Sequence, residues 1–466
     1  MRRPVRQRRA SRQVRQTAGA SETLAAAAHC YAARPVRHRP SVRKVTSVNR
    51  ALAFIFVTVL LNSVGFGIIL PVLPELIVDV SGEPLHEAAR YGGWLAFAYA
   101  LMQFVFSPVV GNLSDRFGRR PILLASLAIF SIDYLVMGFA PTIGWLFLGR
   151  IIAGMSASSF GIANAYIADL FPPDKRAQNF GLIGAAFGSG FVLGPVIGGF
   201  LGEFGPRTPF FVTAGLAFAN VVFGFIALPE TLAPENRRPF KVERANPVGA
   251  YLQMRRFPVV TGMLGAYFLY MLAHDSLPAT WAFYTMERYG WGPREVGFSL
   301  GVVGVCMLIV QGGLIRKVIP LWGAHRAAYF GLSVSALSFF GYALSPTGWW
   351  MYVWIVIGAG SGLVMPAVNG IMSEQIPPNA QGELQGLLGS VASSTFVISP
   401  VVMTQLFAYY SSPAAPVYFP GAAFALAGVL TFAAVTVLAR TLNRHHGSGV
   451  PPDGNTARAE ELEGTD

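Results

Sequence analysis

Four ionisable side chains interrupt long apolar stretches, and their types suit the handling of protons. They are Asp133, Arg150, His274 and Asp275. Ionisable groups in such surroundings are costly and are usually functional. A carboxylate can take up and release a proton, and an arginine beside it favours the charged form. The pattern therefore indicates a protein that binds or moves protons through an apolar environment.

Two hypotheses apply to each group. Asp133 and Arg150 fall in neighbouring apolar runs at similar depth, so they can couple proton movement or form a structural ion pair. Asp275 is hypothesised to be a coupling carboxylate, and the alternative is a residue on a water-filled wall. His274 and Asp275 are adjacent, so on a helix their side chains point about 100° apart and make a poor catalytic dyad.

The composition identifies the environment of these groups. Of the 466 residues, 53% are hydrophobic and 12% are charged, whereas soluble domains carry about 25% charged residues. Runs of about 20 apolar residues are long enough to cross a bilayer as helices. Backbone amides in lipid must bond internally, and these runs are too continuous for barrel strands. We therefore expect an all-α integral membrane protein.

Apolar runs separated by helix breakers predict twelve spans in two halves. The spans are expected near 50–73, 91–111, 121–140, 143–168, 179–202, 209–229, 257–284, 294–318, 324–345, 347–372, 382–407 and 416–439. The predicted divisions are an N-terminal half at 50–229, a cytoplasmic linker at 230–256, a C-terminal half at 257–440 and a cytoplasmic tail at 441–466.

An internal repeat supports the two halves. The segment 168–174 resembles 373–379 at an offset of 205 residues, and each contains a double proline. At the same offset Asn164 meets Asn369, and Pro195 meets Pro400. Such repeats are typical of secondary transporters, whose substrate site lies near the midplane between the halves.

The charge excess lies in the N-terminal tail, residues 1–49. Residues 1–50 hold 13 of the 35 Lys and Arg and one acid, whereas the remainder has 22 basic and 22 acidic residues. The tail lacks a binding fold and is nearly free of aromatic residues, so a nucleic-acid partner is not expected. Three interpretations compete: a disordered tail near anionic lipid, a transit peptide, or an artefact of an upstream start site. We favour an idle tail or the artefact.

Loop charge predicts the orientation. Alternate loops, starting with 112–120, hold up to six Lys and Arg, whereas the loops on the other side hold at most two. Positive charge marks the cytoplasmic side. We therefore expect both termini in the cytoplasm.

The most specific motif lies in the first of these basic loops. It comprises Gly111, Asp115, Arg116, Gly118, Arg119 and Arg120. Gly111 and Gly118 are expected to allow a tight turn. Asp115 can cap a helix or pair with an arginine, and this pair can hold one conformation of a gating loop. The alternative, a basic loop with a helix cap, explains the arginines but not their ordered pattern.

This loop resembles the signature of the major facilitator superfamily. Leu146, Arg150 and Gly154 resemble the motif of its proton-coupled members. A further set resembles the antiporter motif of twelve-span drug exporters: Gly190, Gly194, Pro195, Gly198 and Gly199. Packing alone is the other explanation for these glycines. The whole of residues 50–440 resembles the tetracycline/proton antiporters, for example at Gly65–Pro74 and Pro278–Thr280.

The resemblance implies a fold of twelve helices in two pseudo-symmetric halves that exports a drug in exchange for protons. It implies a multi-pass protein of the bacterial inner membrane, acting as a monomer without a cofactor or resident metal, whose substrate can carry magnesium. Asn62, Gln103 and Asn164 are the candidate cavity residues. Two departures weaken the inference to a tetracycline–magnesium substrate, because Asn62 and Ser335 stand where these antiporters carry aspartates.

Two other functions were weighed. A proton-coupled symporter or facilitator of a metabolite could use the same fold, since fold alone does not decide function. A membrane enzyme is not expected, because the spans carry no Ser-His-Asp set and no phosphate loop. The two cysteines, Cys30 and Cys306, form neither a disulfide framework nor a metal-ligand cluster, and we expect them to be incidental thiols.

Overall fold

A computed structural model of the chain describes residues 42–157, 159–237, 258–377 and 380–447. Within these ranges the regular structure is entirely helical. The predicted tail lies outside the described residues up to position 41, and so does most of the predicted linker. The last helix continues to Gly447, so the described part of the predicted C-terminal tail is helical.

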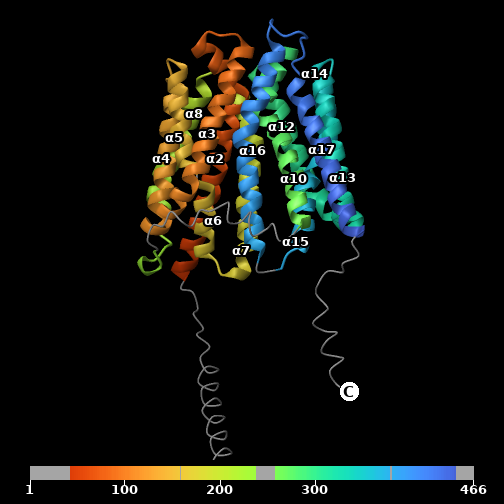
Figure 1. The fold of residues 1–466 in the computed structure, drawn as a ribbon. Coiled ribbons are helices and arrows are strands. Elements are labelled where there is room, and N and C mark those ends of the chain that lie inside the picture. Colours follow the sequence, from red (N-terminus) through yellow and green to blue (C-terminus); the bar gives the residue numbers. More distant parts are fainter. Residues whose placement is uncertain (1–41, 158, 238–257, 378–379, 448–466) are drawn as a thin grey trace, which may run out of the picture. The chain divides into compact units, whose positions relative to one another are not determined.

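Helices of the first set precede the linker and appear in red to yellow-green in Figure 1. They are α2 (Val42–Ser81), α3 (Leu85–Phe117), α4 (Arg119–Gly138), α5 (Ile143–Ser156), α6 (Ser159–Leu170), α7 (Pro173–Gly202) and α8 (Thr208–Ala227). A short 3₁₀ turn, Pro234–Asn236, follows. Pro71, Pro74 and Pro195 lie inside these helices, which is tolerated in membrane helices because neighbouring groups satisfy the freed carbonyls.

Helices of the second set follow the linker and are coloured green to blue in Figure 1. They are α10 (Pro258–His274), α11 (Ser276–Tyr289), α12 (Pro293–Ile309), α13 (Ile315–Leu344), α14 (Gly348–Gly358), α15 (Val364–Glu374), α16 (Gln381–Ser411) and α17 (Ala422–Gly447). A π-helical turn, Val310–Leu314, joins α12 to α13, and a 3₁₀ turn, Ala359–Leu363, joins α14 to α15.

These elements correspond to the twelve predicted spans. Among the described residues, ten helical segments are long and apolar enough to cross a bilayer. One of them, Pro293–Leu344, has 52 residues and turns at Gly323, where φ is +78°. It is therefore long enough for two spans. α10 and α11 meet at Asp275 and together cover the seventh predicted span.

The ends of several helices differ from the prediction. α3 continues to Phe117, so the predicted loop shrinks to the turn at Gly118. The prediction that Gly111 forms the turn is wrong, since it lies inside α3 and a Cβ there would meet nothing within 4 Å. Gly118 alone, with its positive φ, allows the chain to reverse direction between α3 and α4. The last span was expected from 416, but α17 starts at Ala422, because prolines up to Pro420 exclude a helix from the preceding loop.

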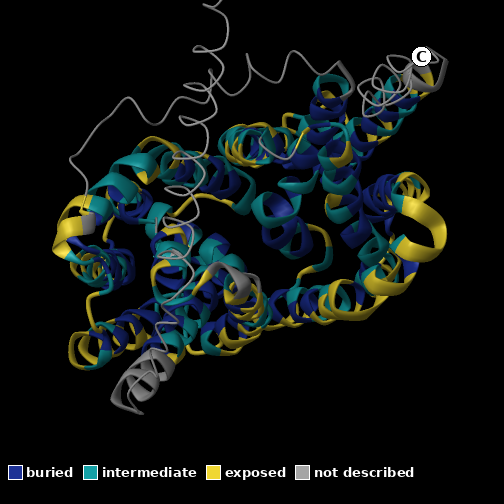
Figure 2. Ribbon diagram, turned by 90° about the horizontal axis from the view of Figure 1, so that it is seen from below, coloured by how far each residue is buried: buried dark blue, intermediate teal, exposed yellow. Residues whose placement is uncertain are grey.

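The packing of the two sets differs between the two ends of the bundle. We call the end that carries the Gly118 turn the loop end, and the opposite one the far end. At the far end, one hydrophobic core joins both sets and includes Leu76, Phe210, Phe283 and Phe407. At the loop end each set has its own core. The outer faces are apolar and exposed, as lipid-facing surfaces must be; Figure 2 shows this burial from the loop end.

Candidate functional site

A cavity of about 660 Å³ lies between the two helix sets. Its wall is largely apolar, and the aromatic side chains in it are Phe66, Phe130, Phe187, Phe191, Tyr99, Trp281, Tyr342 and Phe396. Its polar lining includes Asn62, Gln103, His274, Asp275, Gln311 and Ser361. Cavities of this size and lining enclose drug-sized molecules and orient them with a few polar groups.

Close packing seals the cavity at the far end. Gly199 of α7 faces Gly297 of α12, and a Cβ on Gly199 would lie 3.1 Å from the Gly297 Cα. Gly93 of α3 packs against Thr404 of α16 in the same way. These contacts join the two helix sets.

The same helices separate toward the loop end. A Cβ built on Gly181 or Gly184 of α7 would meet nothing within 4 Å, and the same holds for Gly312 in the π-helical turn after α12 and for Gly386 of α16. The contacts between the two sets are therefore concentrated at the far end, and the central cavity is less closely sealed at the loop end.

Asp275 lies at the break between α10 and α11. It lines the central cavity and a second cavity of about 90 Å³ toward the far end. The Thr395 hydroxyl lies within hydrogen-bonding reach of the Asp275 carboxylate. The Oδ2 atom of Asp275 is buried and has no hydrogen-bond partner among the described residues. This carboxylate is thus presented to both cavities and incompletely satisfied.

The break corrects the expectation of one continuous helix over 257–284. Pro278 lacks an N–H, and its ring clashes with the carbonyl four residues earlier, which belongs to His274. α10 accordingly ends at His274. The Ser399 hydroxyl of α16 donates to the Leu272 carbonyl at 2.8 Å and so satisfies one acceptor near the break. His274 itself lines the cavity and stacks on Tyr270, with ring centroids 5.7 Å apart.

Asp133 of α4 and Arg150 of α5 form a buried ion pair. Arg150 Nη2 donates to Asp133 Oδ2 at 2.8 Å, and it also contacts the Met137 sulfur. The guanidinium lies 5.7 Å from the Tyr99 ring centroid. Arg150 lines the smaller cavity, whereas Asp133 lines neither. The geometry is that of the structural ion pair considered from the sequence, with its arginine facing the cavity that Asp275 also lines.

The glycines of the antiporter motif are contact points along α7. A Cβ on Gly194 would lie 2.5 Å from the Val64 carbonyl oxygen, and Gly190 and Gly198 approach α2 in the same way. Gly199 faces the other helix set, and Pro195 packs against Gly67 of α2. These positions need small residues because helix backbones meet there.

A charge network occupies the predicted gating loop. Arg119 forms ion pairs with Asp115 at 2.6 Å and with Asp169 of α6 at 3.1 Å. The Glu230 carboxylate accepts the backbone N–H groups of Arg119 and Arg120 at 2.9 and 3.2 Å. This places an anion at the N-terminus of α4, where the helix dipole favours it.

The remaining residues of the predicted gating loop make different contacts. The Arg120 side chain donates to the Phe225 carbonyl at 2.7 Å and lies over its ring. Arg116 is exposed and lies over the ring of Phe117. Gly118 takes φ of +109° and abuts Glu230 closely. Sequence reasoning missed Asp169 and Glu230. The available signal for Glu230 was an acid directly after the Leu-Pro pair that ends the preceding helix.

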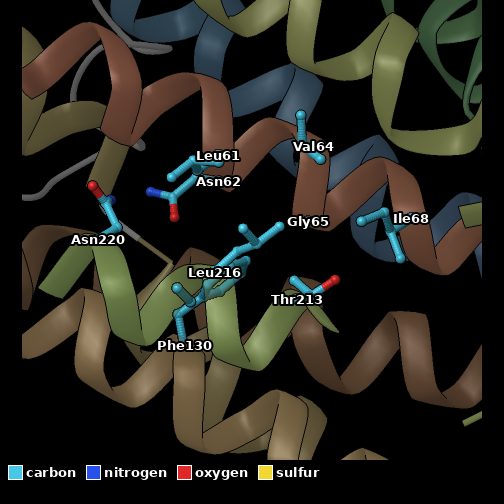
Figure 3. A pocket seen from close by; sticks show the side chains of 10 residues that line it. Leu61, Asn62, Val64, Gly65, Ile68, Phe130, Thr213, Leu216 and Asn220 are labelled. Carbon is cyan, nitrogen blue, oxygen red and sulfur yellow. The ribbon is translucent and has the colours of Figure 1, made fainter. Parts of the chain in front are cut away.

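The three candidate cavity residues have different positions. Asn62 and Gln103 line the central cavity, whereas Asn164 of α6 is not among the described residues that line it. Asn62 also lines a small pocket between α2 and α8 with Asn220 (Figure 3). The Asn220 amide donates to the Thr58 hydroxyl at 3.2 Å.

Comparison with known proteins decides the family. The family model described as Major Facilitator Superfamily matches residues 55–400. The chain belongs to the major facilitator superfamily. The tetracycline resistance protein, class C, of Escherichia coli is 36% identical over 367 residues, which cover 78% of this chain and 91% of that protein. The class B protein of the same organism is 35% identical, with 77% and 89% covered.

Solved structures share the fold. The human organic anion transporter MFSD10 (TETRAN) has a TM-score of 0.62 at 23% identity, covering 84% of this chain and 99% of that one. The nucleoside transporter NupG has a TM-score of 0.70 at 11% identity, with the same coverage. These members of the superfamily are transporters, and the chain is likewise a multi-pass transporter of small molecules and not an enzyme.

Proposed function

We propose that the chain is a drug/proton antiporter, which exports a drug-like molecule of the tetracycline type while protons flow inward. The relatives named as tetracycline resistance proteins match along nearly their whole length. The central cavity has the volume and aromatic lining for such a molecule. The observation that carries the proposal is Asp275, a carboxylate with an unpartnered oxygen at the junction of the two cavities.

In this proposal the protein works by alternating access. The loop end faces the cytoplasm, as the basic loops favour, and both termini lie on that side. The described state then receives the drug from the cytoplasm. Rocking of the two sets would separate Gly199 from Gly297 and close the helices at the loop end. We place the protein in the bacterial inner membrane and expect it to act as a monomer without a resident metal or other cofactor.

Thr395 supports a proton-exchanging role for Asp275. The Thr395 hydroxyl has one proton, and it donates to the Ala392 carbonyl at 2.9 Å. It also lies within reach of Asp275. A protonated Asp275 can donate to Thr395 while Thr395 keeps its bond to Ala392, whereas an ionised Asp275 competes for the threonine proton. The Thr395–Asp275 contact can therefore form with Asp275 protonated or ionised, but the donor of the hydrogen bond differs between the two states.

Transport into everted membrane vesicles tests the proposal. An imposed proton gradient should drive tetracycline uptake, and a protonophore should abolish it. Asp275→Asn should remove gradient-driven uptake while the protein still folds, as judged by size-exclusion chromatography. Glu83→Gln is the matched control, because Glu83 is an exposed acid outside both cavities. Protonophore-insensitive uptake, or undiminished uptake by Asp275→Asn, would contradict antiport through this residue.

A second candidate is a proton-coupled symporter or facilitator of a metabolite. Asn62 and Ser335 favour it, because tetracycline antiporters carry aspartates at these positions and an amide or hydroxyl does not exchange protons at neutral pH. Asn62 lines the central cavity, so its identity bears directly on the cargo. The direction of transport distinguishes the two candidates. A symporter moves its cargo in the same direction as the proton flow, whereas an antiporter moves its cargo in the opposite direction.

A further inference from the structure

The central cavity has one formally charged residue among the described residues that line it, apart from the titratable His274. That residue is Asp275, and the remaining polar groups are amides and hydroxyls. We propose that the cargo is an aromatic organic cation, such as a protonated amine or a quaternary ammonium, rather than an organic anion. The inference rests on the proposed function and names the substrate class of the same site.

The nearest guanidinium does not supply a competing positive charge to the main volume. Arg150 lines the smaller cavity and is paired with Asp133 at 2.8 Å. It is also covered by the Tyr99 ring. His274 faces the main cavity, but a neutral imidazole adds no charge and its ring is stacked on Tyr270. The field in the main cavity is therefore set by one carboxylate.

The aromatic wall suits a cation. Phe66 of α2 and Phe191 of α7 stack with ring centroids 6.3 Å apart, and Phe187 continues the stack at 6.4 Å from Phe191. Ring faces attract cations through their quadrupoles and repel anions. A flat aromatic cargo can lie along these rings with its positive centre toward Asp275. Both contacts select the same sign of charge.

The unpartnered oxygen of Asp275 gives this selection its strength. A buried carboxylate oxygen without a hydrogen bond is destabilised relative to water. A cationic group restores the lost interaction, whereas an anion beside it adds repulsion in a medium of low dielectric. The human MFSD10 structure is that of an organic anion transporter, whereas the lining of this cavity favours the opposite charge.

Because the cavity has one carboxylate, Asp275 also determines how many protons are exchanged for each cargo cation. A proton and a cargo cation neutralise the same oxygen atoms, so each excludes the other. Binding a monocation to the protonated protein must release one proton. The cargo brings its own charge, so binding does not require magnesium. This separates the proposal from a tetracycline–magnesium chelate, in which the metal supplies the charge.

Two probes of matched shape test the proposal. Tetraphenylphosphonium and tetraphenylborate have four phenyl groups about a central atom and opposite charges. Their binding to the full-length protein in lipid nanodiscs is measured by titration calorimetry with EDTA present, at pH 8 and pH 6. The phosphonium should bind more tightly than the borate, more weakly at pH 6 than at pH 8, and about tenfold or more weakly to Asp275→Asn. Glu83→Gln should bind as the unchanged protein does.

Tighter binding of the borate, or phosphonium binding indifferent to both pH and Asp275, would overturn the cation assignment. The comparison of the two probes in the unchanged protein decides the matter even if Asp275→Asn does not fold. The binding measurement uses no proton gradient, so it remains informative even if the protein proves not to be an antiporter. Conversely, gradient-driven transport together with a preference for the borate would refute the cation assignment alone.

Discussion

Arg150 lies 2.8 Å from Asp133, and both side chains are almost completely removed from solvent, at 9% and 0% exposure. The pair joins α4 to α5 within the first helix set. Asp275 has no comparable partner, since none of the ion pairs among the described residues includes it. We therefore propose different roles for the two acids: Asp133 neutralises an arginine, and Asp275 exchanges the proton.

Breaking the Asp133–Arg150 pair should destabilise the fold. Asp133→Asn leaves the Arg150 charge buried and uncompensated, and the free energy of unfolding should fall by about 3–5 kcal/mol. Unfolding in mixed detergent micelles measures this. The control is Asp79→Asn, which removes an ion pair with Arg207 in which both partners are partly exposed, and the loss there should stay within about 1 kcal/mol. Equal losses for the two variants would refute the distinction.

Replacing an α7 glycine by alanine should destabilise the protein only where the added Cβ would contact a neighbouring helix. Gly194→Ala places a Cβ 2.5 Å from the Val64 oxygen, and overpacking of this kind costs about 1–3 kcal/mol. Gly181→Ala adds the same atom to the same helix in open space, and should be neutral or stabilising by roughly 0.5–1 kcal/mol. Melting curves of the two variants in one detergent make the comparison. A more damaging Gly181 variant would contradict the packing described.

Cys306 should report which end of the cavity is open. It lines the central cavity, so in a Cys30→Ser background it is the thiol available to a membrane-impermeant maleimide. In the proposed orientation the loop end faces the reagent in everted vesicles, so we expect labelling there and not in intact cells. Saturating cargo should slow it. Labelling that is faster from the far side would contradict the described state.

A wedge at the far end should reverse this accessibility. Gly297 abuts the Pro195 carbonyl where the helix sets meet, so Gly297→Leu should force the sets apart and admit the maleimide to Cys306 from the far side. Gly313→Leu is the matched control, because a Cβ at Gly313 would meet nothing within 4 Å. If both variants label alike, the far-end contacts do not form the seal.

Glu230 should order the start of α4. Glu230→Ala removes the acceptor for the N–H groups of Arg119, Arg120, Thr231 and Leu232. Loss of such a cap costs about 1 kcal/mol, which corresponds to roughly fivefold faster amide exchange in these segments. Hydrogen exchange with mass spectrometry measures it. Glu235→Ala, at an exposed position after the same loop, should leave the exchange unchanged, and equal effects would argue against the capping role.

The spans and the family were accessible from the sequence, because hydropathy and loop motifs are local signals. The repeat at an offset of 205 residues matches Pro195 with Pro400, and these prolines lie inside α7 and α16. Gly118 was recognised as a turn residue, but Gly111 was not distinguished from it. A glycine pattern does not reveal which member takes a positive φ, because that depends on where the helix ends.

The contacts between distant segments were not accessible. Glu230 reaches the N-terminus of α4 over more than a hundred residues, and no local pattern encodes this. Cys306 was taken as an incidental thiol, yet it lines the cavity, because the sequence does not show which face of α12 turns inward. The break at Asp275 could have been found, since Pro278 clashes with the carbonyl of His274.

Gradient-driven tetracycline uptake tests the role of Asp275 most directly. It is measured in everted vesicles that carry the unchanged protein, Asp275→Asn or Glu83→Gln at equal protein levels. We expect protonophore-sensitive uptake with the unchanged protein and with Glu83→Gln, and none above background with Asp275→Asn. Uphill uptake by Asp275→Asn at the rate of the unchanged protein would rule out Asp275 as the proton-exchanging group.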